Sequence, residues 1–383
     1  MEKLRILHSA DWHLGRSFHG YNLIEEQAHV LEQLVNLAGE SGVDAVIIAG
    51  DVFDRSQPSA EAVSLLNTVL TRICQDLCIP AIVIAGNHDN PERIGFAQHM
   101  LTQQQLYMVG PLNGLWQPIP LYDEYGPVYF CPLPYSEPAF VRNFTGDQSI
   151  HDHHSAMAAM IDYITSTLPA SARKIAVAHA FISGGVESES ERPLSAVGGA
   201  GCVSANLLEL FNYCALGHLH RPQYIGNEKV CYAGSLLKYS FAEAEHRKGV
   251  TLLEIDQNGE LMKGENIALS PRRELRCIEG NLEEILTSDR SDDYIKVVLL
   301  DEGALLDPMG KLRQVFPHIV ELQRPVLHQV PAGLGGERDF RNLTEVDLFR
   351  SFYQQVTGNC LSEPEQGVVA RLVDKFYEKE RGD

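Results

Sequence analysis

Residues 44–54 read DAVIIAGDVFD, and residues 79–89 read IPAIVIAGNHD. In each stretch a short apolar run rich in Ile and Val is followed at once by glycine and then by polar side chains. Apolar runs of this length are typical of strands that are buried on both faces of a parallel sheet. The two stretches therefore predict neighbouring buried strands that end in polar loops.

The chain around these stretches alternates strand and helix. An apolar strand is expected at residues 4–10, and helices are expected at residues 22–41 and 59–75, the second with Ser59 as its N-cap. Further β segments are expected at residues 128–131, 174–178, 214–216, 224–232 and 249–256, with a helix at 154–168. Strands spaced by such helices predict an α/β fold with βαβ units and a largely parallel sheet.

The pattern of expected helices and strands changes near residue 270. Residues 274–325 predict a small α+β unit, residues 330–336 resemble a linker, and two amphipathic helices are expected at 345–356 and 363–378. We therefore divide the chain into three segments: residues 1–270, 271–328 and 329–383. The apolar faces of these two helices must pack against a partner or against each other, because short isolated helices are only marginally stable in water.

Composition and net charge limit the classes of protein to which this chain can belong. The chain has 383 residues, 44% of them hydrophobic, and a net charge of −20. Proteins that hold DNA alone are usually basic, so a stand-alone DNA-binding module is disfavoured, although metal ions or a basic partner would allow action on nucleic acid. The eight cysteines form no C-x-x-C pair, and the N-terminus has no apolar signal region. Reduced thiols in the cytoplasm are therefore expected.

Five polar clusters carry the chemistry, and each follows an apolar run. They are Asp11-Trp12-His13, Gly50-Asp51-Val52-Phe53-Asp54, Gly86-Asn87-His88-Asp89, His179 and Gly217-His218-Leu219-His220. The carboxyl ends of strands in an open α/β sheet are where ligands bind, so these clusters should meet. Carboxylate, imidazole and amide oxygen are ligands for Mn²⁺, Fe²⁺ or Zn²⁺. Glycine before three of the clusters permits a sharp backbone turn.

In this order the five clusters resemble the motif set of the calcineurin-like metallophosphoesterases. Longer stretches are similar to the SbcD nuclease subunits of bacterial SbcCD double-strand-break complexes. These stretches are HSADWHLGRSF (8–18), VIIAGDVFDRSQPS (46–59), VIAGNHDNPER (83–93), ALGHLHRPQ (215–223) and YAGSLLKYSFAEAEHRKGV (232–250). The resemblance implies a sandwich of two central β-sheets flanked by helices, followed by a small α+β capping domain and a helical tail.

The resemblance also implies two divalent metal ions, with Mn²⁺ favoured. One ion would be held by Asp11, His13, Asp51 and His220, and the other by Asp51, Asn87, His179 and His218. His88 would assist the leaving oxygen as a general acid or hydrogen-bond donor, and Asp54 would orient His88 and stabilise its charged form. Spacing alone indicates the pooled ligand set and not this division.

Three other groups have two interpretations each. Arg55 is either a phosphate contact or, more simply, a solvated surface residue. The run of residues 151–154 (HDHH) looks like a metal cluster, but it follows no strand and is expected to be a solvated turn and helix start. Glu187, Glu189 and Glu191 are expected to lie in a solvated loop.

Partners are implied by the resemblance and by apolar surface. The helix at residues 59–75 has more apolar surface than one sheet contact requires, so it is either part of a homodimer interface, together with residues 92–101, or simply well buried. The tail helices would dock on an SbcC-type ATPase, in a heterotetramer with two copies of each chain. DNA is the expected substrate, and no membrane partner is expected.

Three functions remain open at this point. The resemblance favours a DNA nuclease subunit with exonuclease and endonuclease activity in DNA repair, recombination and replication. A stand-alone phosphodiesterase or phosphatase for a smaller substrate is disfavoured by the additional domain and tail. A non-catalytic DNA-end tether is disfavoured because a tether does not need the complete ligand set.

Overall fold

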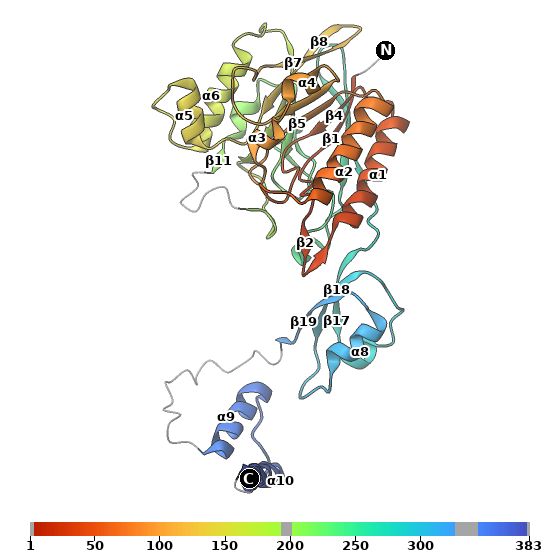
Figure 1. Ribbon diagram of the computed structural model, residues 1–383, viewed down its shortest axis with the longest axis vertical. Helices are drawn as coiled ribbons and strands as arrows, with labels where there is room; N and C mark the ends of the chain where they lie inside the picture. The colour runs from red at the N-terminus through yellow and green to blue at the C-terminus, as the bar shows by residue number, and fades with distance from the viewer. Residues whose placement is uncertain (1–3, 193–200, 326–343, 381–383) are drawn as a thin grey trace. The chain divides into compact units, whose positions relative to one another are not determined.

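The computed structural model describes residues 4–192, 201–325 and 344–380. They belong to two compact units that divide after Arg272 (Figure 1). The expected linker at residues 330–336 lies outside the described residues. The assignment of nuclease, DNA-capping and partner-docking roles to three segments stays a prediction.

The first sheet of unit 1 contains both stretches that opened the sequence analysis. Its strand order is β16-β15-β1-β4-β5-β6. The bounds are β1 Leu4–Ser9, β4 Ala45–Ile48, β5 Ala81–Ile84, β6 Leu106–Val109, β15 Gly249–Ile255 and β16 Leu261–Ala268. The pairs β1–β4, β4–β5 and β5–β6 are parallel, and β15 pairs antiparallel with β1. The predicted buried parallel strands are confirmed, since every residue of β4 and β5 is buried.

A second sheet faces the first. Its strand order is β13-β14-β12-β9-β8-β7. The bounds are β7 Ile119–Asp123, β8 Gly126–Leu133, β9 Arg173–His179, β12 Tyr213–Gly217, β13 Gln223–Ile225 and β14 Asn227–Tyr232. The expected hairpin near residues 224–232 is present as the antiparallel pair β13–β14. Two short pairs lie outside the main sheets: β2 Ser17–Phe18 with β3 Tyr21–Asn22, and β10 Phe181–Ile182 with β11 Cys202–Val203.

An apolar core joins the two sheets. Ile6, Ile47 and Ile84 of the first sheet belong to one buried cluster with Phe130 and Val177 of the second. The inner strands therefore have one face toward the other sheet and one face toward helices, whereas the edge strand β16 is largely exposed. This packing explains why the strands carry continuous apolar runs instead of alternating ones.

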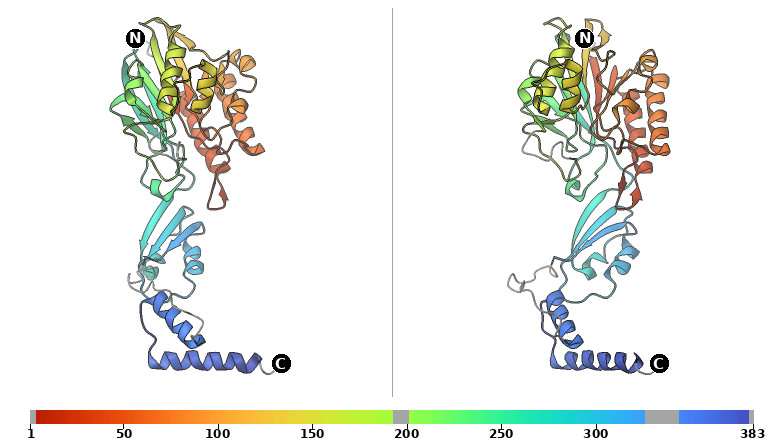
Figure 2. Two further views of the ribbon diagram at one scale, coloured as in Figure 1. Left: turned by 90° about the vertical axis from the view of Figure 1, so that its left-hand side faces the viewer. Right: turned by 60° about the vertical axis from the view of Figure 1, so that its left-hand side comes forward.

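Helices cover the outer faces (Figures 1 and 2). On the side of the first sheet lie α1 (Ile24–Glu40) and α2 (Ala60–Thr71), which continues as a π-helical turn over Arg72–Asp76. Ser59 caps α2 by accepting a hydrogen bond from Ala62 N, as predicted. On the side of the second sheet lie α5 (Pro138–Thr145) and α6 (His153–Thr165), and α6 packs on β8. Short helices α3 (Pro91–Ile94) and α4 (Gln98–Thr102) precede β6. The expected two-sheet sandwich is confirmed.

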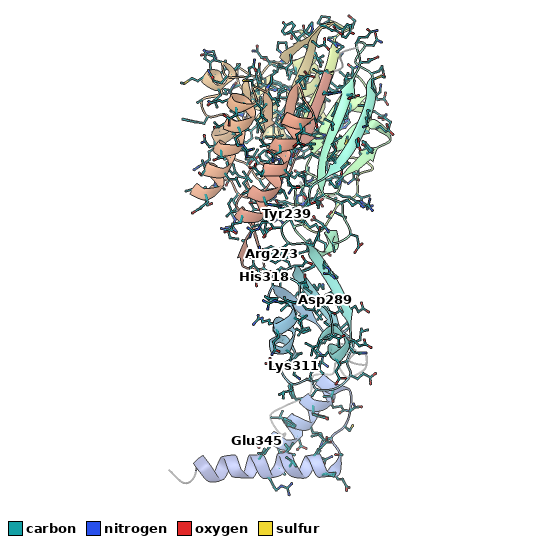
Figure 3. The ribbon with its side chains drawn as sticks, turned by 90° about the vertical axis from the view of Figure 1, so that its right-hand side faces the viewer. Tyr239, Arg273, Asp289, Lys311, His318 and Glu345 are labelled. Carbon is teal, nitrogen blue, oxygen red and sulfur yellow. The ribbon has the colours of Figure 1, made fainter. Side chains whose placement is uncertain are left out.

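Unit 2 begins with a three-stranded parallel sheet. Its strands are β17 (Leu275–Gly280), β18 (Tyr294–Leu299) and β19 (Ile319–Gln323), in that order. Between them run α7 (Leu282–Ile285) and α8 (Pro308–Val315), which carries Lys311 in Figure 3. Leu312 of α8 and Ile295 of β18 belong to one buried cluster. The predicted strand–helix–strand–helix–strand order is confirmed.

The tail forms a helical pair. It consists of α9 (Glu345–Thr357) and α10 (Glu363–Glu380), which contact each other through Arg350 Nη2 and Gln366 Oε1 at 3.1 Å. Phe352 and Leu372 remain 59% and 62% exposed. The side chains of Phe376 and Tyr377, which we expected to extend the second apolar face, lie outside the described residues. Among the described residues, no helix has the length and apolar character needed to cross a membrane.

We expect Leu312→Ala to destabilise unit 2 by about 2–5 kcal/mol, because it removes a fully buried side chain from a small core. Differential scanning calorimetry should show a lower melting temperature for this unit. The control is Leu306→Ala, since Leu306 is 83% exposed and should change stability little. Equal effects of the two substitutions would contradict the packing described here.

Candidate metal centre

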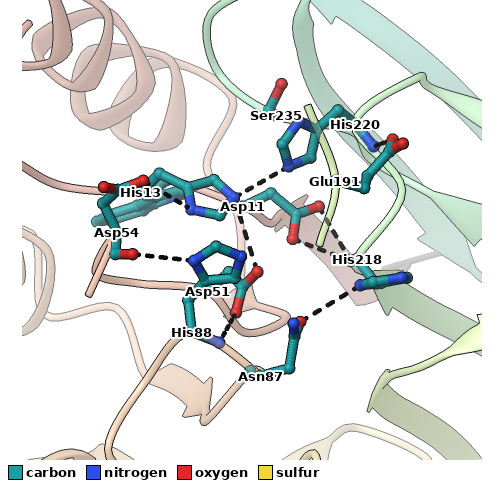
Figure 4. Close-up of polar contacts among 12 residues, drawn as sticks. Asp11, His13, Asp51, Asp54, Asn87, His88, Glu191, His218, His220 and Ser235 are labelled. Carbon is teal, nitrogen blue, oxygen red and sulfur yellow. Dashed lines mark hydrogen bonds and ion pairs between the residues drawn. The ribbon is translucent and has the colours of Figure 1, made fainter. Parts of the chain in front are cut away.

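The five polar clusters meet at one end of the sandwich (Figure 4). Asp11 and His13 follow β1, Asp51 follows β4 and Asn87 follows β5 of the first sheet. The other ligand candidates come from the second sheet, where His179 ends β9 and His218 and His220 follow β12. We expected the strand ends of one open sheet. Two facing sheets supply the residues instead, because their parallel strands point the same way.

Close approach of neighbouring groups excludes a side chain at all three glycines, since a Cβ on Gly50 would lie 2.3 Å from His179 Nδ1. A Cβ on Gly86 would lie 2.2 Å from Asp51 Oδ1, and one on Gly217 would lie 2.0 Å from the carbonyl oxygen of Ala49. Gly50 alone of the three has positive φ (+89°). The sharp turn inferred for all three is therefore correct only for Gly50, whereas Gly86 and Gly217 are needed because neighbouring chain passes over them.

Four candidate ligands have unusual backbone conformations. Asp11, His13, Asp51 and His218 have φ of 53°, 46°, 49° and 107°. Positive φ in non-glycine residues costs of the order of 1–3 kcal/mol each and concentrates at functional sites. The loops are held in place by main-chain hydrogen bonds, among them His13 N to the carbonyl oxygen of Asp51 at 2.9 Å.

Asp51 occupies the centre of the group. Its Oδ2 lies 3.6 Å from His13 Nε2 and 3.5 Å from His179 Nε2, while its Oδ1 accepts a hydrogen bond from His88 N at 2.9 Å. Two potential ligand sets, His13–Asp51–His88 and Asp11–Asp51–His179, share this residue. One carboxylate oxygen between two imidazoles is suited to a ligand shared by two cations.

The hydrogen-bond geometry of the imidazoles fits bound cations. His179 Nδ1 lies 2.9 Å from the carbonyl oxygen of Ala49, so it carries the hydrogen, and Nε2 has only a lone pair. That lone pair faces Asn87 Oδ1, another acceptor, at 2.9 Å. His218 Nε2 is buried without a hydrogen-bond partner. His13 Nε2 and His220 Nε2 lie 3.0 Å apart. Facing acceptors of this kind are relieved by a positive ion between them.

Burial controls the protonation of the site. It lowers the pKa of His13 and His218 well below the usual range, with further lowering by neighbouring imidazoles. Burial also lowers the pKa of His220 to about 4. These shifts favour neutral imidazole, the form that binds metal. Burial and the charge of Asp51 raise the pKa of Asp11 well above its usual range, so two adjacent carboxylates require positive charge to remain ionised together.

His88 lies beside the ligand candidates but is oriented differently from our expectation. Its Nδ1 is 2.9 Å from the main-chain oxygen of Asp54, so the carbonyl and not the carboxylate orients the ring. The Asp54 carboxylate instead lies 3.7 Å from His13 Nδ1 and 3.5 Å from Arg16 Nη1. The predicted carboxylate–imidazole dyad of Asp54 and His88 is therefore wrong in its geometry.

Asp89 is a structural residue that sequence reasoning overlooked. Its carboxylate accepts hydrogen bonds from the backbone N–H groups of Val52, Phe53 and Gly86 at 2.9–3.0 Å. It thereby ties the loop after β4 to the loop after β5. Burial and the charge of Asp51 raise the pKa of Asp89 to about 7. The signal was its place in Gly86-Asn87-His88-Asp89, where we assigned Asn87 to a metal ion and His88 to the leaving oxygen but gave Asp89 no role.

The structure gives a different answer for each of the three groups that the sequence left with two interpretations. The Arg55 side chain is 78% exposed, with Nε 3.6 Å from Asp54 Oδ2. Asp152 caps α6, as expected for a helix start, but His153 is largely buried and stacks on Tyr135. The solvated loop expected for Glu191 is wrong. Its carboxylate accepts a hydrogen bond from His220 N at 2.6 Å, and burial raises its pKa to about 7.

Comparison with known proteins identifies close sequence relatives. Residues 4–222 match the family described as calcineurin-like phosphoesterase, and residues 271–357 match the family described as type 5 capsule protein repressor C-terminal domain. The chain is similar to the SbcD subunit of the SbcCD nuclease of Staphylococcus epidermidis, with 32% identity over 98% of this chain and 100% of that protein.

Solved structures show weaker similarity. TT1561 of Thermus thermophilus is 14% identical, with a TM-score of 0.40, and the match covers 69% of this chain and 99% of that one. A dimetal phosphatase from Danio rerio is 12% identical, with a TM-score of 0.41, over 70% of this chain and 99% of that one. These values are too low to support an argument about the site.

We expect Gly86→Ala to abolish metal binding and to lower stability by about 1–3 kcal/mol, because the new methyl group would displace Asp51. Bound metal per chain and the melting temperature are the measurements. Gly114→Ala is the control, since a Cβ there meets no atom within 4 Å. Normal metal content in the Gly86 variant would contradict the close approach described here.

Proposed function

Because this chain belongs to the SbcD family of calcineurin-like phosphoesterases, and is therefore a metal-dependent nuclease that hydrolyses phosphodiester bonds, we propose that it cleaves DNA ends as the nuclease subunit of a complex with an SbcC-type ATPase. The observation that carries the proposal is that the seven candidate ligands meet in one place, with Asp51 Oδ2 lying between the imidazoles of His13 and His179. Relatedness over nearly the whole chain favours this function over a stand-alone enzyme for a smaller substrate.

The family implies divalent metal ions, and we assign two of them, Mn²⁺ in preference. His13 and His220 would contribute to one site, and Asn87, His179 and His218 to the other, with Asp51 shared. The placement of Asp11 in the first site is the least supported assignment, since its oxygens accept from His218 N at 2.9 and 3.1 Å. When bound, two such ions activate a water, orient the phosphodiester and neutralise the charge that develops on it.

The role of His88 follows from its orientation. Its Nδ1 hydrogen is directed to the carbonyl oxygen of Asp54, which leaves Nε2 for substrate. The ring lies edge-on to His13, with centroids 4.8 Å apart, and its backbone N–H fixes Asp51 Oδ1. We assign His88 to the leaving oxygen, as a general acid or hydrogen-bond donor. Asp54 then positions His88 through its main chain and His13 through its carboxylate.

Exposed apolar residues support two partner surfaces. Val63 of α2, Phe96 and Met100 are 46%, 78% and 72% exposed, and we assign them to a homodimer interface. The exposed faces of α9 and α10 are suited to helix-in-groove or coiled-coil contact with the ATPase. A heterotetramer of two nuclease and two ATPase chains follows from these assignments. All eight cysteines are free, which supports the proposed cytoplasmic location.

One assay separates the competing functions. The purified chain, with and without a co-expressed SbcC-type ATPase, is offered duplex DNA, single-stranded DNA and a small chromogenic phosphodiester. The proposal expects cleavage of DNA ends that increases with the ATPase and ATP. Hydrolysis of the small substrate alone would indicate a stand-alone phosphodiesterase, and DNA binding without hydrolysis would indicate a tether.

We expect His88→Ala to retain both metal ions and to lose roughly 10²–10⁴-fold in nuclease turnover, because a leaving-group helper holds no ion. Metal content and single-turnover rates are measured together, with His99→Ala at an exposed position as the control. Loss of metal from the His88 variant would instead make His88 a ligand, as one of the two potential ligand sets allows.

We expect a chain ending at Val330 to remain folded, dimeric and metal-loaded and to hydrolyse the small phosphodiester normally. It should fail to co-elute with the ATPase in size-exclusion chromatography, because it lacks the tail helices. The full-length double variant Phe349→Asp and Leu372→Asp tests the same faces without truncation. Full-stoichiometry co-elution of either protein would contradict docking through the tail.

A further inference from the structure

A buried ion pair lies behind His220. Glu243 is fully buried, and its Oε2 lies 2.6 Å from Nζ of Lys248, which is 6% exposed. Lys248 Nζ also donates to the carbonyl oxygen of His220 at 2.7 Å and to Ser235 Oγ at 2.8 Å. The ion pair is therefore attached directly to the residue that we assign as a metal ligand.

The other carboxylate oxygen of Glu243 faces the His220 ring. Oε1 lies 3.5 Å from His220 Nδ1, and Ser190 Oγ contacts both atoms. The arrangement allows His220 Nδ1–H to donate to Ser190, whose hydroxyl donates in turn to Glu243. With the hydrogen on Nδ1, the lone pair of Nε2 is directed toward His13 Nε2, 3.0 Å away.

The main chain of His220 is held as well. Glu191 Oε1 accepts a hydrogen bond from His220 N, and Tyr239 N donates to Glu243 Oε2 at 3.2 Å. The Tyr239 ring packs edge-on against His220, with centroids 5.8 Å apart. His220 thus has its ring nitrogen, its N–H and its carbonyl oxygen held by the side chains of Ser190, Glu191 and Lys248, which come from two other segments of the chain.

Stability does not account for this ion pair. Buried ion pairs can often be replaced by apolar residues without loss of stability, because desolvation offsets their attraction. Oε2 of Glu243 pairs with Lys248 Nζ at 2.6 Å, which leaves Oε1 to face His220 Nδ1 at 3.5 Å. A carboxylate placed behind an imidazole orients a metal ligand and raises its basicity.

We propose that Glu243, paired with Lys248 and acting through Ser190, is a positioning residue that fixes the tautomer and direction of His220 and thereby sets the affinity of one of the two metal sites. The inference rests on the proposed two-ion centre and adds residues that the metal-ligand motifs do not include. The site that contains His179 and His218 should be independent of it, because His179 is oriented by the carbonyl oxygen of Ala49.

The test is titration of metal-free, full-length protein with MnCl₂ by isothermal calorimetry. Glu243→Gln should weaken one Mn²⁺ site by roughly 10–100-fold and leave the other unchanged. Glu245→Gln is the matched control, because it makes the same change at an exposed position two residues away and should bind both ions normally. Ser190→Ala keeps the ion pair and should also weaken one site, which provides a test if Glu243→Gln does not fold.

A double variant separates positioning from stability. Glu243→Gln with Lys248→Met removes both charges and should melt closer to the wild type while still binding one ion weakly. Restored affinity in this variant, or wild-type affinity in folded Glu243→Gln, would overturn the inference and leave the two-ion centre intact. A wild-type chain that binds fewer than two Mn²⁺ ions would contradict the centre itself and this inference with it.

Discussion

The close approach of the two sheets at the ends of β4, β5, β9 and β12 is the constraint on which the rest of the site depends. A Cβ on Gly50 of the first sheet would lie 2.3 Å from His179 Nδ1 of the second, and a Cβ on Gly217 of the second would lie 2.0 Å from the carbonyl oxygen of Ala49 of the first, so neither position has room for a side chain. Only this approach brings carboxylates from the first sheet to imidazoles of the second. A single open sheet would spread the same residues along one edge.

This proximity creates an electrostatic requirement. Asp11 and Asp51 are almost fully buried among four imidazoles, and desolvation disfavours every charged form there. The lone pair of His179 Nε2 faces the amide oxygen of Asn87, another acceptor, and His13 Nε2 lies 3.0 Å from His220 Nε2. Divalent cations satisfy both conditions at once, because they balance the carboxylates and occupy the space between the lone pairs. The strained backbone at four ligand positions is consistent with a site built to hold them.

Charged residues that are not candidate ligands support the site. Asp89 ties two loops together, Glu191 holds His220 N, and the Glu243–Lys248 pair lies behind the His220 ring. Asp89, Glu243 and Lys248 are buried and Glu191 is partly buried, so each needs a polar partner, and each partner is a backbone group or a side chain of the site. The net charge of the chain therefore includes carboxylates near the metal centre that are not exposed to solvent.

The sequence by itself determined the strands and the candidate ligands, because both are local patterns. An apolar run such as AIVIA must be buried, and a polar group directly after it must lie at the end of that strand, so all seven candidate ligands were predicted and do lie together. The sequence also determined the order of elements in unit 2 and the helical tail. Only the tertiary structure decided that two sheets share the site, that Asp54 meets His88 through its carbonyl, and that Glu191 is partly and Glu243 fully buried. Those facts depend on where loops far apart in the chain meet, and a glutamate in a loop has the same sequence signature whether water or a buried imidazole lies beside it.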